Sequence, residues 1–180
     1  MQIESKLNVL MEKVRKGQME RNEYEYVSQF LGNKNFLVFG TGYDTEFWRH
    51  CNKGINIFLE HDKNWIPQDS RDVYLVNYKT QILKYKEYLN NYTSLEMDLP
   101  QQVLDTTWDV IFVDGPPGNK KRSHGRMQSI YTAWKLANEN TDVFVHDCNR
   151  PVEDTYSKHF FTIEKQLKKL RHCKRKHNAV

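Results

Sequence analysis

A short, wholly apolar segment followed by two glycines constrains this chain more than any other part of its sequence. Residues 36–39 read Phe-Leu-Val-Phe, and a Gly-Thr-Gly turn follows at 40–42. Such a run is typical of a buried parallel strand, and glycines let a ligand approach bare backbone. Asp44 then stands where a side chain can cap a helix that begins at Thr45. The sequence predicts a strand, a glycine turn and a helix, an arrangement that binds adenosine-containing cofactors.

The glycine turn departs from the dinucleotide-binding fingerprint. That fingerprint requires a third glycine three residues after Gly42, where this chain has Thr45. Taken alone, the turn is equally consistent with a structural role. A second apolar run at 55–59 ends in Glu60, however, and a carboxylate there can accept both hydroxyls of an adenosine ribose. Together these features favour a nucleoside cofactor without phosphates, and S-adenosylmethionine fits best.

Length and charge limit the class of protein. At 180 residues we expect one domain over 1–180, with N-terminal helices over 1–31 and a basic tail over 165–180. Seven of the 27 Lys and Arg residues lie in 165–176, where no acidic residue occurs, so the rest of the chain carries 20 basic against 23 acidic side chains, a net charge of −3. The body is therefore not a basic platform for nucleic acid, and such a terminal run is usually solvated.

No segment of the sequence predicts a membrane protein or a disulfide scaffold. The first ten residues lack the apolar region of a signal peptide, and no run approaches membrane-spanning length. We therefore expect a cytoplasmic or otherwise intracellular protein. Three cysteines without a CxxC pair argue against disulfides and zinc, and we expect them to be reduced and buried: Cys51, Cys148 and Cys173.

The remaining sequence alternates between predicted helices and strands. Helical spacing predicts an N-terminal helix through Leu7, Leu10, Met11 and Val14, which Gly17 interrupts. Apolar runs predict further strands at 73–76, 108–113 and 141–145. We expect Ser123 to cap a long helix and Pro151 to begin the last one. The alternation predicts a doubly wound, mostly parallel α/β sheet, with antiparallel edge strands from 160–174.

Acidic residues follow three of the predicted strands, namely Glu60, Asp114 and Asp147, and His146 precedes the last of them. Ligands collect at the carboxyl ends of strands in open sheets. Methyl transfer to a sugar hydroxyl needs positioning and a base, for which Asp114 and His146 are candidates. Asp114 and Asp147 could instead hold a divalent metal that lowers the hydroxyl's pKa. The alternatives are a structural histidine and a loop-bracing carboxylate.

A basic cluster follows the loop at 114–119, whose prolines and glycines fix an irregular backbone. Lys120–Arg122 are equally consistent with a solvated loop. Arg126 can bind a carboxylate through two parallel hydrogen bonds, which a lysine cannot reproduce. We therefore expect Arg126 to contact an acidic substrate.

Several separated segments of this chain resemble the plant DUF579 family of glucuronoxylan 4-O-methyltransferases. They are NFLVFGTGYD at 35–44, FLEHD at 58–62, YKT at 78–80, VDGP and GRM…IYTA within 113–133, and DVFVHDCNR with VE within 142–153. His124 stands where the family has proline, so acceptor recognition is expected to differ. We expect no counterpart here of the family's N-terminal membrane anchor.

The resemblance implies a Rossmann-like class I methyltransferase that uses S-adenosylmethionine to methylate a sugar hydroxyl, as in 4-O-methylation of glucuronic acid. It implies cofactor contacts from Phe39, Gly40, Thr41, Gly42, Asp44, Glu60, His61, Tyr78 and Asp114. It implies substrate contacts with a uronic acid or related glycan from His124, Arg126, Asn149 and Arg150. It assigns catalysis to Asp114, His146 and Asp147, and it lends support to a divalent metal (Mg, Mn or Co) on Asp114 and Asp147.

Other functions stay open at this point. A nucleic-acid methyltransferase would use the basic tail to hold phosphates, although the segment at 114–118 ends in glycine where a base-stacking aromatic would stand. A small-molecule methyltransferase or a non-catalytic binding module would keep the same fold. The sequence does not predict an oligomeric state.

Overall fold

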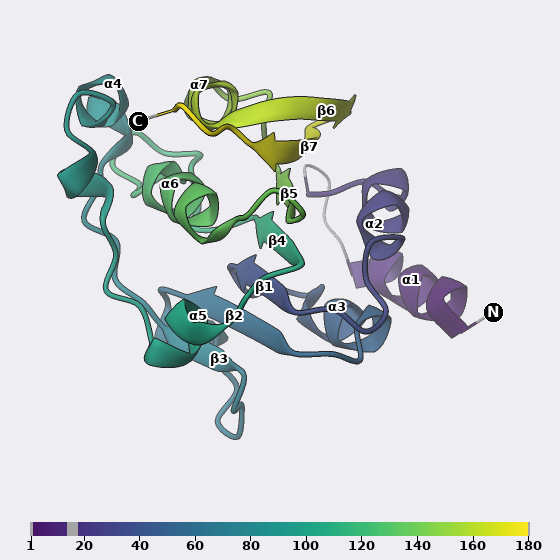
Figure 1. Cartoon of the computed structure of the whole chain (residues 1–180). Coiled ribbons are helices and arrows are strands. Elements are labelled where there is room, and N and C mark those ends of the chain that lie inside the picture. Colours follow the sequence, from purple (N-terminus) through teal and green to yellow (C-terminus); the bar gives the residue numbers. More distant parts are fainter. Residues whose placement is uncertain (1, 14–17, 180) are drawn as a thin grey trace.

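One mixed sheet forms the centre of the structure, a computed structural model that describes residues 2–13 and 18–179. The strands of these residues follow the spatial order β3-β2-β1-β4-β5-β7-β6 (Figure 1). They are β1 (Phe36–Phe39), β2 (Asn56–Glu60), β3 (Val73–Leu75), β4 (Val110–Val113), β5 (Asp142–Val145), β6 (Phe161–Leu167) and β7 (Leu170–Arg175). Strands β1 to β5 are parallel to one another. Strand β7 pairs antiparallel with β5, and β6 pairs antiparallel with β7. The predicted doubly wound sheet with an antiparallel C-terminal edge is confirmed.

The central strand β1 buries all four of its side chains, alternately on the two faces of the sheet. Phe36 and Val38 pack with the helices of one face, α1 (Gln2–Lys13), α2 (Arg21–Ser28) and α3 (Thr45–Cys51). Leu37 and Phe39 pack with those of the other face, α5 (Gln101–Asp105), α6 (Met127–Leu136) and α7 (Pro151–Phe160) (Figure 1). Each such burial stabilises the fold by roughly 1.5–3 kcal/mol. Because helices cover both faces, β1 is a continuous apolar run.

The strand order reverses at β1, and this reversal positions the site. The chain runs outward from β1 through β2 to β3, then returns to the other side of β1 as β4 and β5. Val38 of β1 pairs with Phe58 of β2 on one side and Phe112 of β4 on the other. The loops after β1 and β4 therefore lead in opposite directions and leave a crevice between them, where open sheets bind their ligands.

Short helical segments complete the connections, namely η1 (Lys63–Trp65), η2 (Ile82–Lys84), α4 (Tyr85–Tyr88) and η3 (Tyr92–Leu95). The N-terminal helix agrees with the predicted apolar face, although Val14 and Gly17 lie outside the described residues. The three cysteines are free and buried, as predicted. Across the described ranges, every helix is too short or too polar to cross a bilayer.

The helix expected to start at Ser123 begins later, at Met127. Arg126 occupies the N-cap position, without a side-chain cap. Gly125 has a φ of +70°, a left-handed conformation that interrupts a helix and that glycine adopts readily. Ser123 instead lies in a turn, and its carbonyl accepts a hydrogen bond from the backbone N of Ile82.

The basic run at 165–176 is part of the sheet rather than a solvated tail, which corrects the expectation for this segment. Arg171 is buried and donates to Ser157 Oγ at 2.8 Å. Lys174 Nζ lies 2.7 Å from Asp142 Oδ1, and Lys165 Nζ lies 4.2 Å from the centre of the Tyr26 ring. The sequence predicted edge strands within 160–174, but it could not indicate the partners of these charged side chains, because those partners come from elsewhere in the chain.

Candidate active site

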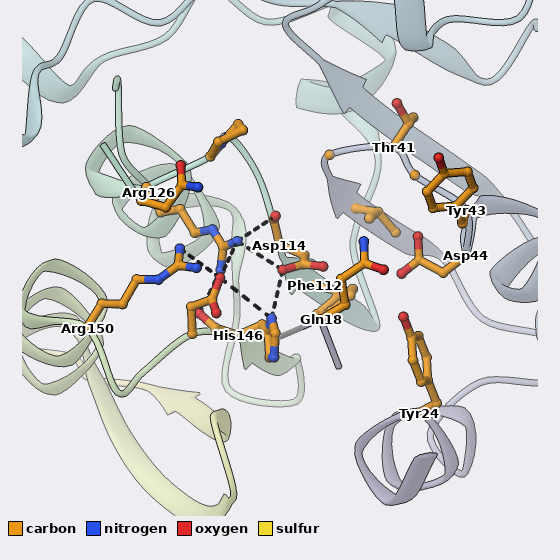
Figure 2. Close-up of a pocket in the computed structure, with 17 residues that line it drawn as sticks. Gln18, Tyr24, Thr41, Tyr43, Asp44, Phe112, Asp114, Arg126, His146 and Arg150 are labelled. Carbon is orange, nitrogen blue, oxygen red and sulfur yellow. Dashed lines mark hydrogen bonds and ion pairs between the residues drawn. The ribbon is translucent and has the colours of Figure 1, made fainter. Parts of the chain in front are cut away.

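A pocket of about 230 Å³ opens at the carboxyl ends of β1, β4 and β5 (Figure 2). The loops that follow these strands form its wall, and Gln18 and Tyr24 close it from the N-terminal side. It brings together nine predicted site residues: Gly40, Thr41, Gly42, Asp44, Asp114, Arg126, His146, Asp147 and Arg150. The pocket therefore lies at the reversal of strand order, as expected for a ligand site.

The loops after β1 and β4 touch through two glycines. Gly40 has a φ of +109°, and a Cβ atom there would lie 3.2 Å from the Gly115 Cα. A Cβ atom on Gly115 would lie 2.8 Å from the Gly40 Cα, closer than real side chains approach. Both positions therefore require glycine, and the turn presents bare backbone to the pocket.

Asp44 occupies the N-cap position of α3, but its side chain does not cap the helix, so this part of the prediction is wrong. Its carboxylate instead accepts a hydrogen bond from Trp48 Nε1 at 3.0 Å. Figure 2 shows the carboxylate facing the pocket. Burial, reinforced by Asp114, raises the pKa of Asp44 to about 6. A cationic ligand group beside it would favour the ionised form.

Glu60 lies outside the pocket lining, with its carboxylate engaged by the protein. It accepts hydrogen bonds from the backbone N and the Oγ1 of Thr41, each at 2.8 Å. Its other oxygen accepts from the backbone N atoms of His61 and Asp62, at 2.7 and 2.8 Å. In this geometry Glu60 braces the glycine turn from behind rather than presenting a free carboxylate to a ribose.

The remaining predicted contacts do not line the pocket. His61, Tyr78 and His124 lie together, with ring centroids 6.0 to 6.3 Å apart. His61 also borders a separate cavity of about 430 Å³ near the ends of β2 and β3. Phe39 is fully buried in the core, and Asn149 is exposed. The predicted cofactor residues thus divide into a group in the pocket and a group toward β2.

Asp114 and His146 form a hydrogen-bonded pair in the pocket, with 3.0 Å between Asp114 Oδ1 and His146 Nδ1. Burial alone would lower the pKa of His146, but the Asp114 carboxylate outweighs it and raises that pKa. Burial alone would likewise raise the pKa of Asp114, but His146 and Arg126 lower it. The Asp114 side chain is 29% exposed and that of His146 is 3% exposed, so Asp114 is the member that a substrate can reach.

Arg126 is a buried brace between the loops after β4 and β5. Its Nη2 lies 3.0 Å from Asp114 Oδ1 and 2.8 Å from Asp147 Oδ2. The guanidinium also donates to the carbonyls of His146 and Asp114, both at 2.8 Å, and more weakly to that of Pro116. Figure 2 shows this side chain directed into the acidic cluster. The geometry therefore differs from the predicted clamp for a substrate carboxylate.

Asp114, His146 and Asp147 are close enough to form a metal site, because one ligand atom from each lies within 4.8 Å of the others. Arg126 contacts both carboxylates, however, and Arg150 Nη1 lies 2.9 Å from Asp147 Oδ2. Two guanidinium groups thus balance the two carboxylates. This arrangement does not fit a divalent cation, because binding would require a guanidinium to move away.

Two residues of α2 belong to the site although the sequence suggested only packing there. Glu23 is fully buried and accepts hydrogen bonds from the backbone N atoms of Lys169 and Leu170, at 2.9 and 3.0 Å. Its Oε2 lies 3.8 Å from His146 Nε2. Tyr24 lines the pocket beside Asp44 (Figure 2). The only sequence signal for Glu23 was its capping-box position, which says nothing about β7 or His146.

Glu153 should make the protein less stable as the pH rises. It is fully buried, and neither carboxylate oxygen has a hydrogen-bond partner within the described residues. Burial raises its pKa, so the folded state holds the proton more tightly than the unfolded state, and stability falls as pH rises above the unfolded-state pKa of about 4.3. Glu153→Gln should therefore stabilise the protein, more at pH 8 than at pH 5.

Urea unfolding at both pH values measures this effect. The exposed Glu164, changed to Gln, is the matched control and should alter stability little at either pH. A Glu153→Gln protein less stable than the wild type at pH 8 would contradict the prediction.

The strand order, the antiparallel last strands and the glycine turn at the strand reversal define a Rossmann-like protein of the class I methyltransferase type. A solved structure from Thermoplasma acidophilum has this fold, with a TM-score of 0.54 at 10% identity over 99% of this chain and 100% of that one. The likeness concerns the fold alone. The chain belongs to the IRX15/IRX15L/GXM family, whose model matches residues 23–97 and 93–175.

Relatives in Arabidopsis thaliana carry names that describe glycan methylation. Glucuronoxylan 4-O-methyltransferase 1 is 35% identical, over 86% of this chain and 67% of that protein. Glucuronoxylan 4-O-methyltransferase 2 is 36% identical, over 77% of this chain and 58% of that protein. Arabinogalactan O-methyltransferase 1 is 32% identical, over 72% of this chain and 55% of that protein. The chain thus spans between about half and two thirds of these relatives' lengths.

Proposed function

We propose that this chain is an S-adenosylmethionine-dependent O-methyltransferase that acts on a sugar hydroxyl, in a uronic acid or related glycan residue. One observation carries the proposal: the glycine turn after β1 and the Asp114–His146 pair face the same pocket at the strand reversal. Relatives named for methylation of glucuronoxylan and arabinogalactan support the acceptor class.

The pocket residues fit the cationic end of this cofactor. Gly40 and Gly42 expose backbone groups to a ligand in the pocket. Asp44 exposes a carboxylate, and its pKa is raised because it is buried without a strong cationic partner. A bound sulfonium and ammonium would supply the missing positive charge. At about 230 Å³ the pocket is small for a complete cofactor, since ligand sites commonly measure roughly 300–1,000 Å³. The adenosine would therefore extend past Thr41 toward the cavity beside His61.

The chain's own residues then position the acceptor and move its proton. When bound, S-adenosylmethionine would supply a methyl group on a sulfonium, which passes to an in-line oxygen nucleophile as the neutral thioether leaves. Asp114, the accessible member of its pair, accepts the proton of the attacking hydroxyl, and His146 shares it through the 3.0 Å hydrogen bond. Arg126 holds Asp114 and Asp147 in place. General base catalysis of this kind contributes typically about 10²–10⁴-fold.

The alternative of a nucleic-acid methyltransferase has less support. It depended on a free basic tail, whereas Arg171, Lys174 and Lys165 of that run contact groups of the protein itself. The three basic residues of the loop at 120–122 are exposed.

Two measurements test the proposed function. Isothermal titration should give saturable binding of S-adenosylmethionine and of its demethylated product, and labelled methyl should pass to glucuronic-acid-containing glycans. We expect transfer to persist with a chelator, because arginines already neutralise the acidic cluster. Loss of transfer on chelation, restored by Mn²⁺, would assign Asp114 and Asp147 to a metal instead. Absence of cofactor binding would leave only a non-catalytic binding module.

A further inference from the structure

A second cavity, of about 370 Å³, lies between α1 and α3 and meets the first pocket at Tyr43. We call it the α1–α3 groove. Its charged wall includes Lys6 and Lys13 of α1 and Lys53 just after α3, and Val9 and Phe47 supply apolar surface. Lys6 and Lys13 lie two turns apart on the same helix, whereas Lys53 is distant in sequence, so no local pattern indicated that it would join them.

The positive charge of this groove is largely uncompensated. Arg49, which also lines it, is paired with Asp72 and Glu46. In contrast, no ion pair among the described residues involves Lys6, Lys13 or Lys53. The pKa of His50 in the same wall is lowered by burial and then by Lys53 and Lys6, as expected beside unpaired ammonium groups. Unpaired ammonium groups that gather in one groove attract anionic ligands to it.

The groove and the first pocket have opposite chemistry and share one wall. The pocket exposes Asp44 and Asp114, whereas the groove exposes lysines, and the acidic residue in its lining, Glu46, pairs with Arg49. Tyr43 lies between them, 44% exposed, and makes an edge-to-face contact of 5.5 Å between ring centroids with Trp65, which is 45% exposed. Exposed aromatic rings offer flat apolar surface on which the C–H face of a sugar ring can pack, and this pair stands beside the pocket's mouth.

An acidic acceptor needs a cationic partner that the first pocket does not provide freely. Arg126 was the predicted partner, but it pairs with Asp114 and Asp147 inside the protein. We propose that the α1–α3 groove binds a carboxylate-bearing stretch of the acceptor polysaccharide, while Tyr43 carries the chain across to the Asp114 pocket. The location of this subsite is independent of the chemistry at Asp114, but its purpose rests on the proposed function.

The lysines suit an acidic polysaccharide better than a unique small anion. Lysine acts as a flexible point charge and does not impose the paired geometry of arginine. Three separated ammonium groups can therefore bind carboxylates that are spaced variably along a polysaccharide chain. A nucleic acid carries far denser charge, which three lysines in one groove do not match.

Charge reversal in the groove tests the proposal. Lys6→Glu with Lys53→Glu should raise the KM for glucuronoxylan about tenfold at low salt, with kcat and the KM for its carboxyl-reduced form nearly unchanged. The effect should diminish at high ionic strength, where exposed charges are screened. The matched control is Lys84→Glu with Lys86→Glu, which makes the same charge change on exposed lysines of η2 and α4, away from the groove.

The possible outcomes separate this inference from the proposed function. If the wild type methylates glucuronoxylan and both double variants behave alike, the groove proposal is overturned and the methyltransferase stands. If no glycan is methylated but titration with glucuronoxylan shows salt-dependent binding that only Lys6→Glu with Lys53→Glu weakens, the groove stands and the proposed function fails. Tighter binding of a single-stranded RNA than of glucuronoxylan, lost in the same variant, would overturn the glycan assignment.

Discussion

Replacement of Arg126 by methionine should lower the free energy of unfolding by about 3–5 kcal/mol, the range measured when one partner of a buried ion pair is removed. The guanidinium is 4% exposed and contacts the carboxylates of Asp114 and Asp147. Methionine fills much of the volume but leaves both carboxylates without this partner, and several backbone carbonyls lose a donor. Urea unfolding followed by circular dichroism measures the change.

Two further variants show whether the position is structural. Arg126→Lys keeps the charge but cannot reach all of the same acceptors, so its loss of stability should be smaller than that of Arg126→Met. Arg122→Met removes an exposed arginine and should leave stability nearly unchanged. If Arg126→Met unfolded like the wild type but raised KM for an acidic acceptor alone, Arg126 would be a substrate clamp after all.

Replacement of Asp114 by asparagine should reduce kcat by roughly 10²–10⁴-fold, the usual contribution of a general base. Asparagine preserves the shape of the side chain but cannot take the proton of an attacking hydroxyl. Binding of S-adenosylmethionine should change little, because Asp44 and the backbone of Gly40 and Gly42 form most of its proposed seat. Single-turnover assays at saturating cofactor measure the chemical step directly.

The control for this variant must exclude a general loss of structure. Asp98→Asn alters an almost fully exposed aspartate whose ion pair with Lys79 lies on the surface, and it should leave kcat unchanged. Unfolding curves for Asp114→Asn show how much of the Arg126 network is retained. An Asp114→Asn enzyme with near wild-type kcat would remove Asp114 from the proton transfer.

The sheet could be predicted because its signals are local. The apolar run of β1, the glycine turn after it and the apolar run of β4 each depend on a few adjacent residues. The boundaries of helices were harder to predict from sequence. The start of α6 depends on the left-handed conformation of Gly125 rather than on the capping tendency of Ser123.

The site was predictable to the extent that it follows from topology. Asp114, His146 and Asp147 stand at the ends of neighbouring parallel strands, so their convergence follows from the strand pattern. The partners of individual side chains could not be predicted in this way, because the burial of Arg126 and Glu60 depends on contacts between distant segments. The lysines of the α1–α3 groove illustrate the same limit, since α1 and α3 meet only in the folded chain.

The hydrogen bonds that Glu23 accepts from the backbone N–H groups of Lys169 and Leu170 affect the order in which the protein can fold during synthesis. They connect α2 to the start of β7, beside His146. On the ribosome, Glu23 emerges long before the backbone N–H groups from which it accepts, so the wall around His146 cannot close until translation has passed β7. A nascent chain can therefore form the Gly-Thr-Gly turn after β1 before the surroundings of His146 are complete.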